Sequence, residues 1–353
     1  MLLIINMCAC TKEKSSSEDD INTENPPIIE IGDGNENEEE EVFAPEEIPP
    51  APEVVLTSAD ENYVMKVGDK EITEAMLRYY LLNYAKQYGG DNEKLWEEQT
   101  VKSIKKYVAS EVLADKVGVV MGDEQNEYHN YLIAYTVNKY DNTPDTSYKK
   151  ALEDMYLTDA LNRDMTKSGI RANMLYNEYI TEGGKMYNAT GDDIYSYIKD
   201  NYVRIKHILI KTVDLDDAQK AEARKRAEKV CDQAISGHNF EELVRQYSED
   251  TMDVDTGYYF TRGEKIQVLE NKAYELKNGE VSDIVESAYG YHIIKKYEHD
   301  RDYVLSDKTL RSEALSNICE KADATDVEIV AQGLKVQYYQ NYRQVKEKIL
   351  AER

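Results

Sequence analysis

Two histidines, His207 and His292, each lie in the middle of a stretch whose side chains alternate in the manner of a β-strand. The two stretches cover residues 204–211 and 289–295, and branched apolar residues flank both histidines. Histidine donates and accepts hydrogen bonds and titrates near neutral pH, so two histidines on paired strands could organise a polar network. The alternative is that each histidine is a core or edge residue with a structural role only.

The residues between these stretches contain the elements that must bring the two strands together. Apolar residues at helical spacing end near Gly237, and Asn239 can cap a second helix. A strand is expected at residues 257–260, and a third helix should end at Asn278 and Gly279. The inward side chains of the three helices are Ala221, Ala227, Val230 and Ala234, then Phe240, Leu243, Val244 and Tyr247, then Leu269, Ala273 and Leu276. Residues 202–298 therefore have the predicted order β-α-α-β-α-β.

This order, together with five short motifs, resembles the parvulin family of peptidyl-prolyl isomerases. The motifs are HILI at residues 207–210, FEEL running into YSED at 240–250, FTRGE at 260–264, LKNGEVS at 276–282 and YGYHII at 289–294. The resemblance implies an α+β domain that catalyses cis/trans isomerisation of X-Pro peptide bonds. Rotation about that partly double C–N bond breaks no bond, so we expect neither a metal nor a cofactor.

The resemblance also implies which side chains form the site. The catalytic network would consist of His207, Asp250, Ser287 and His292, with Asp250 orienting a histidine and fixing its tautomer. Asp250 could instead simply cap the turn after Tyr247, a position that Asp favours.

Substrate contacts follow from the same resemblance. Phe260 and Leu269 would form an apolar shelf for the proline ring, with Lys265 and Tyr259 beside it. Lys265 stands where the family commonly has methionine or another apolar residue, and Leu269 stands where phenylalanine is usual. The alternative function is therefore a chaperone, or holdase, that uses this unit to bind unfolded chains without isomerase activity.

Length and charge limit the class of protein. The 353 residues favour two or three domains, and a formal charge of −26 without a basic stripe makes nucleic acid an unsuitable partner. Residues 1–58 carry fifteen Asp and Glu against two Lys, which accounts for half of the net charge. Residues 11–58 also hold six of the seven prolines, so we expect a disordered, acidic, Pro-rich stalk.

The extreme N-terminus resembles the end of a bacterial lipoprotein signal. Ala9 and a short apolar run precede Cys10, and a Ser-rich tether follows. We therefore expect residues 1–10 to be a signal remnant with its natural start upstream of Met1, and Cys10 to carry a diacylglyceryl anchor. The alternative is an accidental apolar N-terminus of a cytosolic protein.

Residues 60–201 have the pattern of a helical lobe. A hairpin at residues 63–72 precedes a helix capped by Thr73, and further helices are expected at 93–117, 123–140, 146–167 and 170–187. This opening resembles the N-terminal chaperone lobe of PrsA-type and SurA-type foldases. The resemblance implies that residues 300–353 return as helices that pack on this lobe, leaving the parvulin unit at 202–299 as a separate domain.

These expectations combine into one functional prediction. The chain should be a foldase that isomerises X-Pro bonds in unfolded or nascent secreted polypeptides. It should act at the extracytoplasmic face of a Gram-positive cell membrane, held there by the lipid on Cys10.

Overall fold

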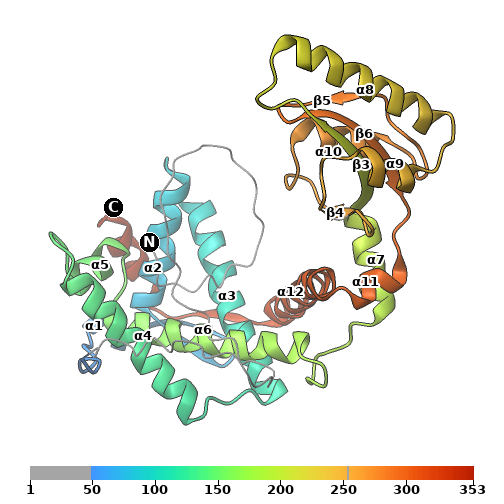
Figure 1. The fold of residues 1–353 in the computed structure, drawn as a ribbon. Helices are drawn as coiled ribbons and strands as arrows, with labels where there is room; N and C mark the ends of the chain where they lie inside the picture. The colour runs from blue at the N-terminus through green and yellow to red at the C-terminus, as the bar shows by residue number, and fades with distance from the viewer. Residues whose placement is uncertain (1–48, 253) are drawn as a thin grey trace. The chain divides into compact units, whose positions relative to one another are not determined.

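The computed structural model describes residues 49–252 and 254–353, which form two compact units. Unit 1 comprises the described residues up to Met186 together with Ala322–Arg353, and unit 2 comprises Tyr187–Lys321 (Figure 1). The predicted signal remnant, the lipidation site at Cys10 and most of the predicted stalk lie outside the described residues. The mixture of helices with small sheets confirms the α+β prediction.

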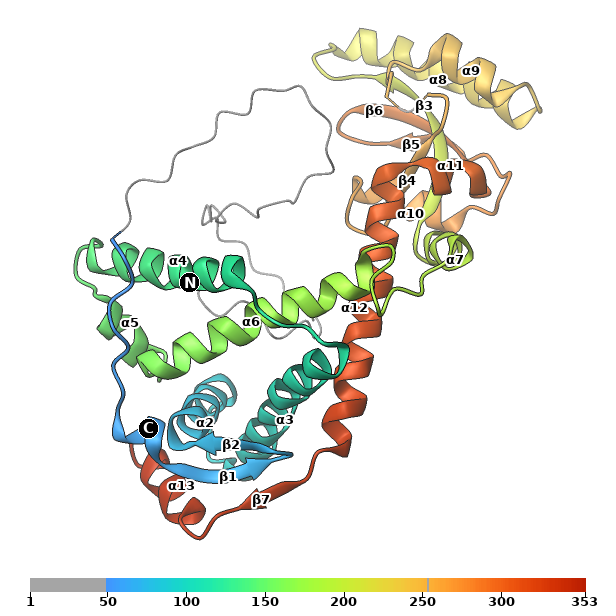
Figure 2. The same cartoon turned by 90° about the horizontal axis from the view of Figure 1, so that it is seen from below.

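Unit 1 contains a three-stranded antiparallel sheet with the order β2-β1-β7. Its strands are β1 Tyr63–Val67, β2 Lys70–Thr73 and β7 Val336–Tyr338. The β1–β2 hairpin was expected from the sequence, whereas β7 was not, because three residues are too few for an alternation to be recognised. Figure 2 shows β7, from the end of the chain, alongside β1 from its beginning.

Helices make up the rest of unit 1, and polar caps readable in the sequence start most of them. The Thr73 side chain accepts a hydrogen bond from the Met76 amide, and Gly118 ends the third helix in the left-handed conformation at φ 82°. The helices are α1 Ser58–Glu61, α2 Glu74–Tyr88, α3 Glu93–Val117, α4 Asp123–Asp141, α5 Tyr148–Asp154, α6 Asp159–Ile180, α13 Tyr342–Leu350 and the second part of α12 Lys308–Gly333.

One predicted helix boundary is wrong. The expected break near residue 168 falls inside α6, and the chain instead leaves helical geometry between α5 and α6, where Tyr156 has φ 61°. Thr158 then restarts the helix, because its side chain accepts a hydrogen bond from the Leu161 amide. Gly169 is buried within α6, so this glycine does not end a helix.

The hydrophobic core of unit 1 joins both ends of the chain. Trp96, the only tryptophan in the sequence, is fully buried there. Tyr342, Val345 and Ile349 of α13 pack into the same cluster as the apolar residues of α2. The C-terminal segment thus returns to the helical lobe, although residues 300–321 belong to unit 2.

Unit 2 is built on a four-stranded antiparallel sheet with the order β4-β3-β6-β5. The strands are β3 Val203–Lys211, β4 Tyr258–Phe260, β5 Val285–Glu286 and β6 Gly290–Tyr297. The helices are α7 Gly191–Asn201, α8 Asp217–Ile235, α9 Phe240–Tyr247, α10 Gln267–Glu275, α11 Arg301–Ser306 and the first part of α12. The predicted β-α-α-β-α-β order is therefore present, with the two-residue strand β5 added.

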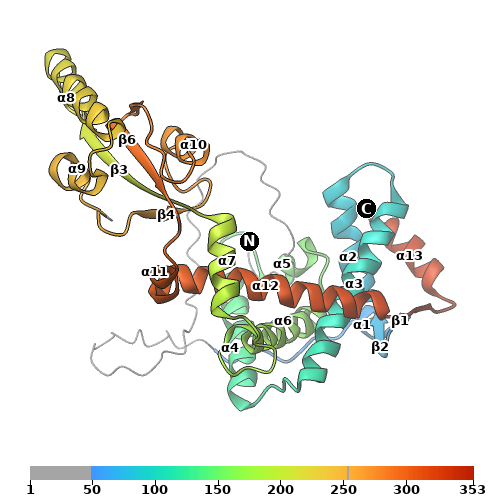
Figure 3. The ribbon, with the colours of Figure 1, turned by 90° about the vertical axis from the view of Figure 1, so that its right-hand side faces the viewer.

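The alternation of β3 assigns its side chains to two cores. Ile208 and Ile210 face α8 and α9, whereas Val203 and Ile205 pack with α10 on the other face. Figure 3 shows α9 and α10 on opposite sides of β3 and β6. Both central strands are therefore covered on both faces. Within the described residues, no helix is long and apolar enough to cross a membrane.

The packing of α13 predicts that the lobe depends on the end of the chain. Ile349→Ala should destabilise unit 1 by about 2–4 kcal/mol, because a fully buried isoleucine would leave a cavity. Trp96 fluorescence during urea unfolding reports on this unit alone. Arg343→Ala on the exposed side of α13 is the control and should change little. Equal midpoints for the two variants would contradict this arrangement.

Candidate active site

The strand register brings the two predicted histidines together. His207 pairs with Ile294 across the β3–β6 ladder and Leu209 pairs with His292, so the histidines are diagonal neighbours on the α10 face of the sheet. Their Nδ1 atoms lie 3.1 Å apart. The rings are stacked, with 5.3 Å between centroids and 15° between planes.

The segment after α9 places Asp250 beside His207. The short strand β4 pairs only with the first residues of β3, and the segment after α9 bonds to the same edge of β3 further along. The Glu249 amide donates to the Leu209 carbonyl at 2.8 Å, and the Ser248 hydroxyl accepts from the Leu209 amide at 3.2 Å. Asp250 Oδ2 then lies 2.8 Å from His207 Nε2. Asp250 also accepts from the Met252 amide, so it caps a turn as well as contacting the histidine.

Ser287 reaches His292 through a tight turn that ends at Gly290. Ser287 Oγ lies 2.7 Å from His292 Nε2, and the Ser287 amide donates to the Gly290 carbonyl at 2.9 Å. Gly290 has φ 147°, and a Cβ at this position would lie 2.1 Å from the carbonyl oxygen of Ile210. Only glycine fits here, so the turn that carries Ser287 depends on Gly290.

The hydrogen bonds form a chain with one direction when both histidines are neutral. The Asp250 carboxylate can only accept, so His207 Nε2–H donates to it and His207 Nδ1 must be an acceptor. His292 Nδ1–H then donates to His207 Nδ1, which leaves His292 Nε2 to accept from the Ser287 hydroxyl. Each neutral imidazole thus holds a defined tautomer.

The electrostatics of the site favour these neutral histidines. His207 and His292 are 7% and 3% exposed. Burial lowers the pKa of His207 despite the neighbouring Asp250, and burial together with His207 lowers the pKa of His292 to about 4. Burial alone would raise the pKa of Asp250, but hydrogen bonds from Tyr258, Met252 and His207 lower it below its usual value. At neutral pH the network therefore carries the single negative charge of Asp250.

Comparison with known proteins identifies this unit. The family model of the PPIC-type peptidyl-prolyl isomerase domain, a rotamase domain, matches residues 207–298. These residues form a parvulin domain. The match includes His207, Asp250, Ser287 and His292, and the recognition from sequence of a PrsA-like parvulin protein is confirmed.

The similarity to PrsA foldases extends beyond the parvulin domain. Foldase protein PrsA 1 of Bacillus cereus is 42% identical over 104 residues, which cover 28% of this chain and only 32% of that protein. Foldase protein PrsA of Bacillus subtilis is 28% identical over 251 residues, which cover 70% of this chain and 75% of that protein. A crystal structure of PrsA from Bacillus cereus aligns with 74% of this chain and 85% of its own at 22% identity. The TM-score of this alignment is 0.28.

Sequence reasoning missed one member of the network, Tyr258. Its hydroxyl donates to Asp250 Oδ2 at 2.7 Å, and its ring packs edge-on against His207. The predicted residue Tyr259 points to the other face of β4, where it stacks on Tyr303 and its hydroxyl accepts from the Asp300 amide. Residues two apart share a face of a strand, so the prediction of Phe260 as a site residue should have selected Tyr258 rather than Tyr259.

The predicted proline shelf is not an open surface in this structure. Phe260 is fully buried and Leu269 is 5% exposed, and both pack in the core beneath α10. Lys265 lies with its Nζ 4.3 Å from the centre of the Tyr258 ring, at the edge of the network. The cavity beside His207 and Asp250 has a volume of about 10 Å³, and the 69%-exposed side chain of Met252 borders it.

The lowered histidine pKa values predict that the parvulin domain loses stability in mild acid. An unfolded histidine binds protons near pH 6.5, whereas folded His292 stays neutral down to about pH 4. The free energy of unfolding is therefore unaffected by protonation of His292 above pH 6.5. It falls by on the order of 2–3 kcal/mol as the pH drops from 6.5 towards 4, because only the unfolded chain then binds the proton. Hydrogen exchange of the β3 and β6 amides between pH 7.5 and 4 measures this loss in the domain itself.

His292→Gln is the matched variant for this measurement, because glutamine does not titrate. Its exchange-derived stability should fall less steeply with decreasing pH than that of the wild type. Parallel pH profiles for the two proteins would show that His292 is not held neutral.

Proposed function

We propose that the parvulin domain catalyses cis/trans isomerisation of X-Pro bonds in unfolded secreted polypeptides. The observation that carries this proposal is the continuous hydrogen-bonded chain Ser287, His292, His207 and Asp250. Such a chain buries two neutral histidines and holds a carboxylate at one end, which is an arrangement that a purely structural core does not need.

The chemistry of amide rotation explains why such a network is useful. In the planar amide, resonance places partial negative charge on the carbonyl oxygen, and twisting the C–N bond removes part of that charge. If the substrate's carbonyl oxygen lies near the Asp250 carboxylate, the two negative charges repel each other. This repulsion raises the free energy of the planar amide more than that of the twisted amide. The network lowers the barrier through this difference, without a nucleophile or a bond to break.

The two ends of the chain are the parts that a substrate can reach. Asp250 and Ser287 are half-buried, whereas both histidines are buried. We infer that the histidines hold the accessible Asp250 and Ser287 in place and fix their protonation, while these two groups contact the prolyl amide.

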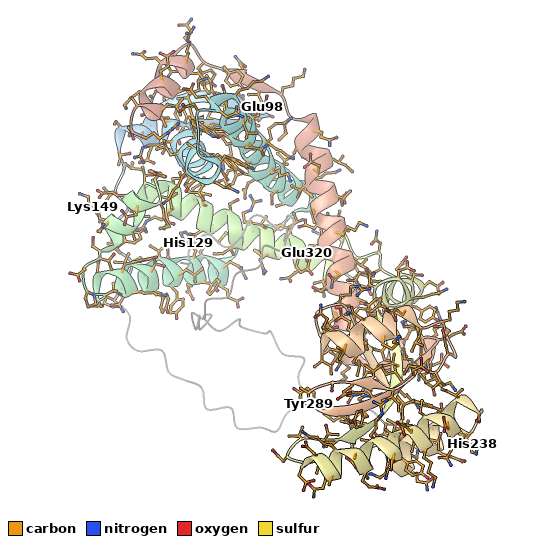
Figure 4. The ribbon with its side chains drawn as sticks, turned by 90° about the horizontal axis from the view of Figure 1, so that it is seen from above. Glu98, His129, Lys149, His238, Tyr289 and Glu320 are labelled. Atoms are coloured by element: carbon orange, nitrogen blue, oxygen red, sulfur yellow. The ribbon has the colours of Figure 1, made fainter. Side chains whose placement is uncertain are left out.

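A holdase without isomerase activity is the second candidate function. The small cavity and the buried Phe260 side chain favour it, because a proline ring needs an apolar pocket that this structure does not hold open. Met252 and Tyr289 are large exposed side chains near the network and supply an alternative apolar surface. Figure 4 shows Tyr289 on the opposite end of the unit from His238.

We further propose that the protein works at the extracytoplasmic face of the membrane. The support is the Ala9-Cys10 pair with its Ser-rich tether and the acidic, Pro-rich residues 11–58, which would serve as a spacer. A diacylglyceryl group supplies the two chains that stable membrane anchoring requires.

Isomerase activity should depend on the network residues. In a proline-isomerisation assay on the full chain, His292→Ala should lower the rate above background by about tenfold or more. Tyr258→Phe removes one hydrogen bond to Asp250 and should have a smaller effect in the same direction. Uncatalysed exchange takes tens to hundreds of seconds, so a weak catalyst remains detectable.

Each of these variants has a matched control. His238→Ala removes an exposed histidine whose ring is hydrogen-bonded to the Gln233 carbonyl, and Tyr259→Phe removes the neighbouring hydroxyl that faces away from the network. Both controls should retain wild-type rates. A folded wild-type protein with no rate above background would favour the holdase.

Membrane attachment should depend on Cys10. Expressed in a Gram-positive host behind a basic and apolar leader, the protein should sediment with membranes, and Cys10→Ser should release it. Cys8→Ser, two residues away, is the control and should stay with the membrane fraction. Sedimentation that Cys10→Ser does not alter would contradict lipidation.

A further inference from the structure

An extended, proline-rich stretch of the chain lies against unit 1 at a place that the parvulin domain does not explain. Residues 49–57 form no helix or strand. Three prolines in four residues, Pro49, Pro50 and Pro52, favour the polyproline II conformation. We call residues 49–56 the proline segment.

Two charged side chains of α6 hold the proline segment through its backbone. Asp159 Oδ2 accepts from the Val55 amide at 2.9 Å, and the Arg163 guanidinium donates to the Pro52 carbonyl at 2.9 Å. Arg163 Nε also bonds to both oxygens of Asp159, at 3.0 and 3.1 Å. The pair thus binds one backbone carbonyl and one backbone amide of the segment, three residues apart. These two hydrogen bonds do not depend on which side chains the bound segment carries.

Hydrogen bonds from Tyr148 and Asn162 hold the Asp159–Arg163 pair in position. Asp159 is 8% exposed, and its second oxygen accepts from the Tyr148 hydroxyl at 2.7 Å. Asn162 in turn donates to that hydroxyl. Burying a carboxylate costs free energy unless both of its oxygens accept hydrogen bonds. One oxygen of Asp159 accepts its bond from the backbone of the proline segment, so the position of this carboxylate is suited to binding an extended chain.

A cleft lies between the proline segment and the surface of α4 and α6. An open cleft of about 720 Å³ remains between residues 49–54 and the surface formed by Asn130, Tyr131, Ala134 and Arg163. Tyr131 is 41% exposed and lies in a row of stacked rings with Tyr128 and Tyr135 along α4. Aromatic surfaces of this kind bind proline-rich segments.

The segment's own apolar residues are not buried in that cleft. Val54, Val55 and Leu56 are 49%, 64% and 58% exposed. Little apolar surface therefore holds the segment in place, and its attachment rests on the backbone hydrogen bonds and on its covalent tether.

We propose that the Asp159–Arg163 pair and the tyrosine row of α4 form a second polypeptide-binding site. Its ligand is an extended chain containing proline and large aliphatic residues, and the proline segment occupies it as an exchangeable latch. A polypeptide that makes the same backbone hydrogen bonds and also fills the cleft displaces the latch. The site does not depend on isomerase activity, because its residues lie in unit 1.

The experiment measures binding of a fluorescent peptide with the sequence of residues 49–56 to the full chain. Val55→Pro in the protein removes the amide hydrogen that Asp159 accepts, so the latch weakens and the peptide should bind about tenfold more tightly than to the wild type. Val54→Pro leaves the Val55 amide in place and is the matched control, with wild-type affinity expected.

Further variants in the Val55→Pro background identify the site. Arg163→Gln should abolish the gain in affinity, whereas Lys167→Gln, one turn further along α6 and exposed, should retain it. Tyr131→Ser should weaken peptide binding several-fold. Tyr131 is an exposed residue, so this variant tests the location of the binding site even if Arg163→Gln unfolds the lobe. A second peptide with proline at the position of Val55 should bind poorly. Equal affinity of wild type and Val55→Pro, or binding unaffected by Arg163 and Tyr131, would overturn the proposal.

Discussion

The antiparallel register between β3 and β6 is the constraint on which the active site depends. It places His207 and His292 diagonally on one face, with their Nδ1 atoms 3.1 Å apart. Side chains alternate with a period of two, so a slip of one residue would turn one histidine to the α8 and α9 face and break the network. Ile208 and Ile293 on that face and Ile294 on the other secure the register, because each is fully buried.

Burial then determines the protonation of the network. The same packing that fixes the register removes both imidazoles from water and lowers their pKa values, while hydrogen bonds keep Asp250 ionised. A chain of neutral donors and acceptors ending in a carboxylate has one arrangement of protons. The structure thus supplies a fixed negative charge and a fixed hydroxyl, which an amide rotation can use without exchanging protons with the protein.

The predictions from sequence succeeded where a side chain's position along a strand or helix sufficed. The resemblance to parvulins implied a network of His207, Asp250, Ser287 and His292, and the structure joins these four side chains by hydrogen bonds. The helix caps Thr73 and Asn239 were predicted correctly because a cap is a local feature. The helix break before Thr158 was missed because one helix was expected over residues 146–167, whereas the chain forms α5 and α6 with the break between them. The break expected near residue 168 is absent because glycine is tolerated inside a packed helix such as α6. Tyr259 was predicted in place of Tyr258, although Tyr258 lies two residues from the predicted site residue Phe260 and therefore shares its face of β4. The burial of Phe260 and the pairing of β7 with β1 were not predicted, because both result from contacts between residues far apart in the sequence.

The single arrangement of protons in the chain of Ser287, His292, His207 and Asp250 can be measured directly. Nitrogen-15 NMR of the imidazole rings at neutral pH reports which nitrogen of each carries hydrogen. We expect two neutral rings of opposite tautomer, with hydrogen on Nε2 of His207 and on Nδ1 of His292. A doubly protonated ring at pH 7, or the same tautomer in both rings, would contradict it.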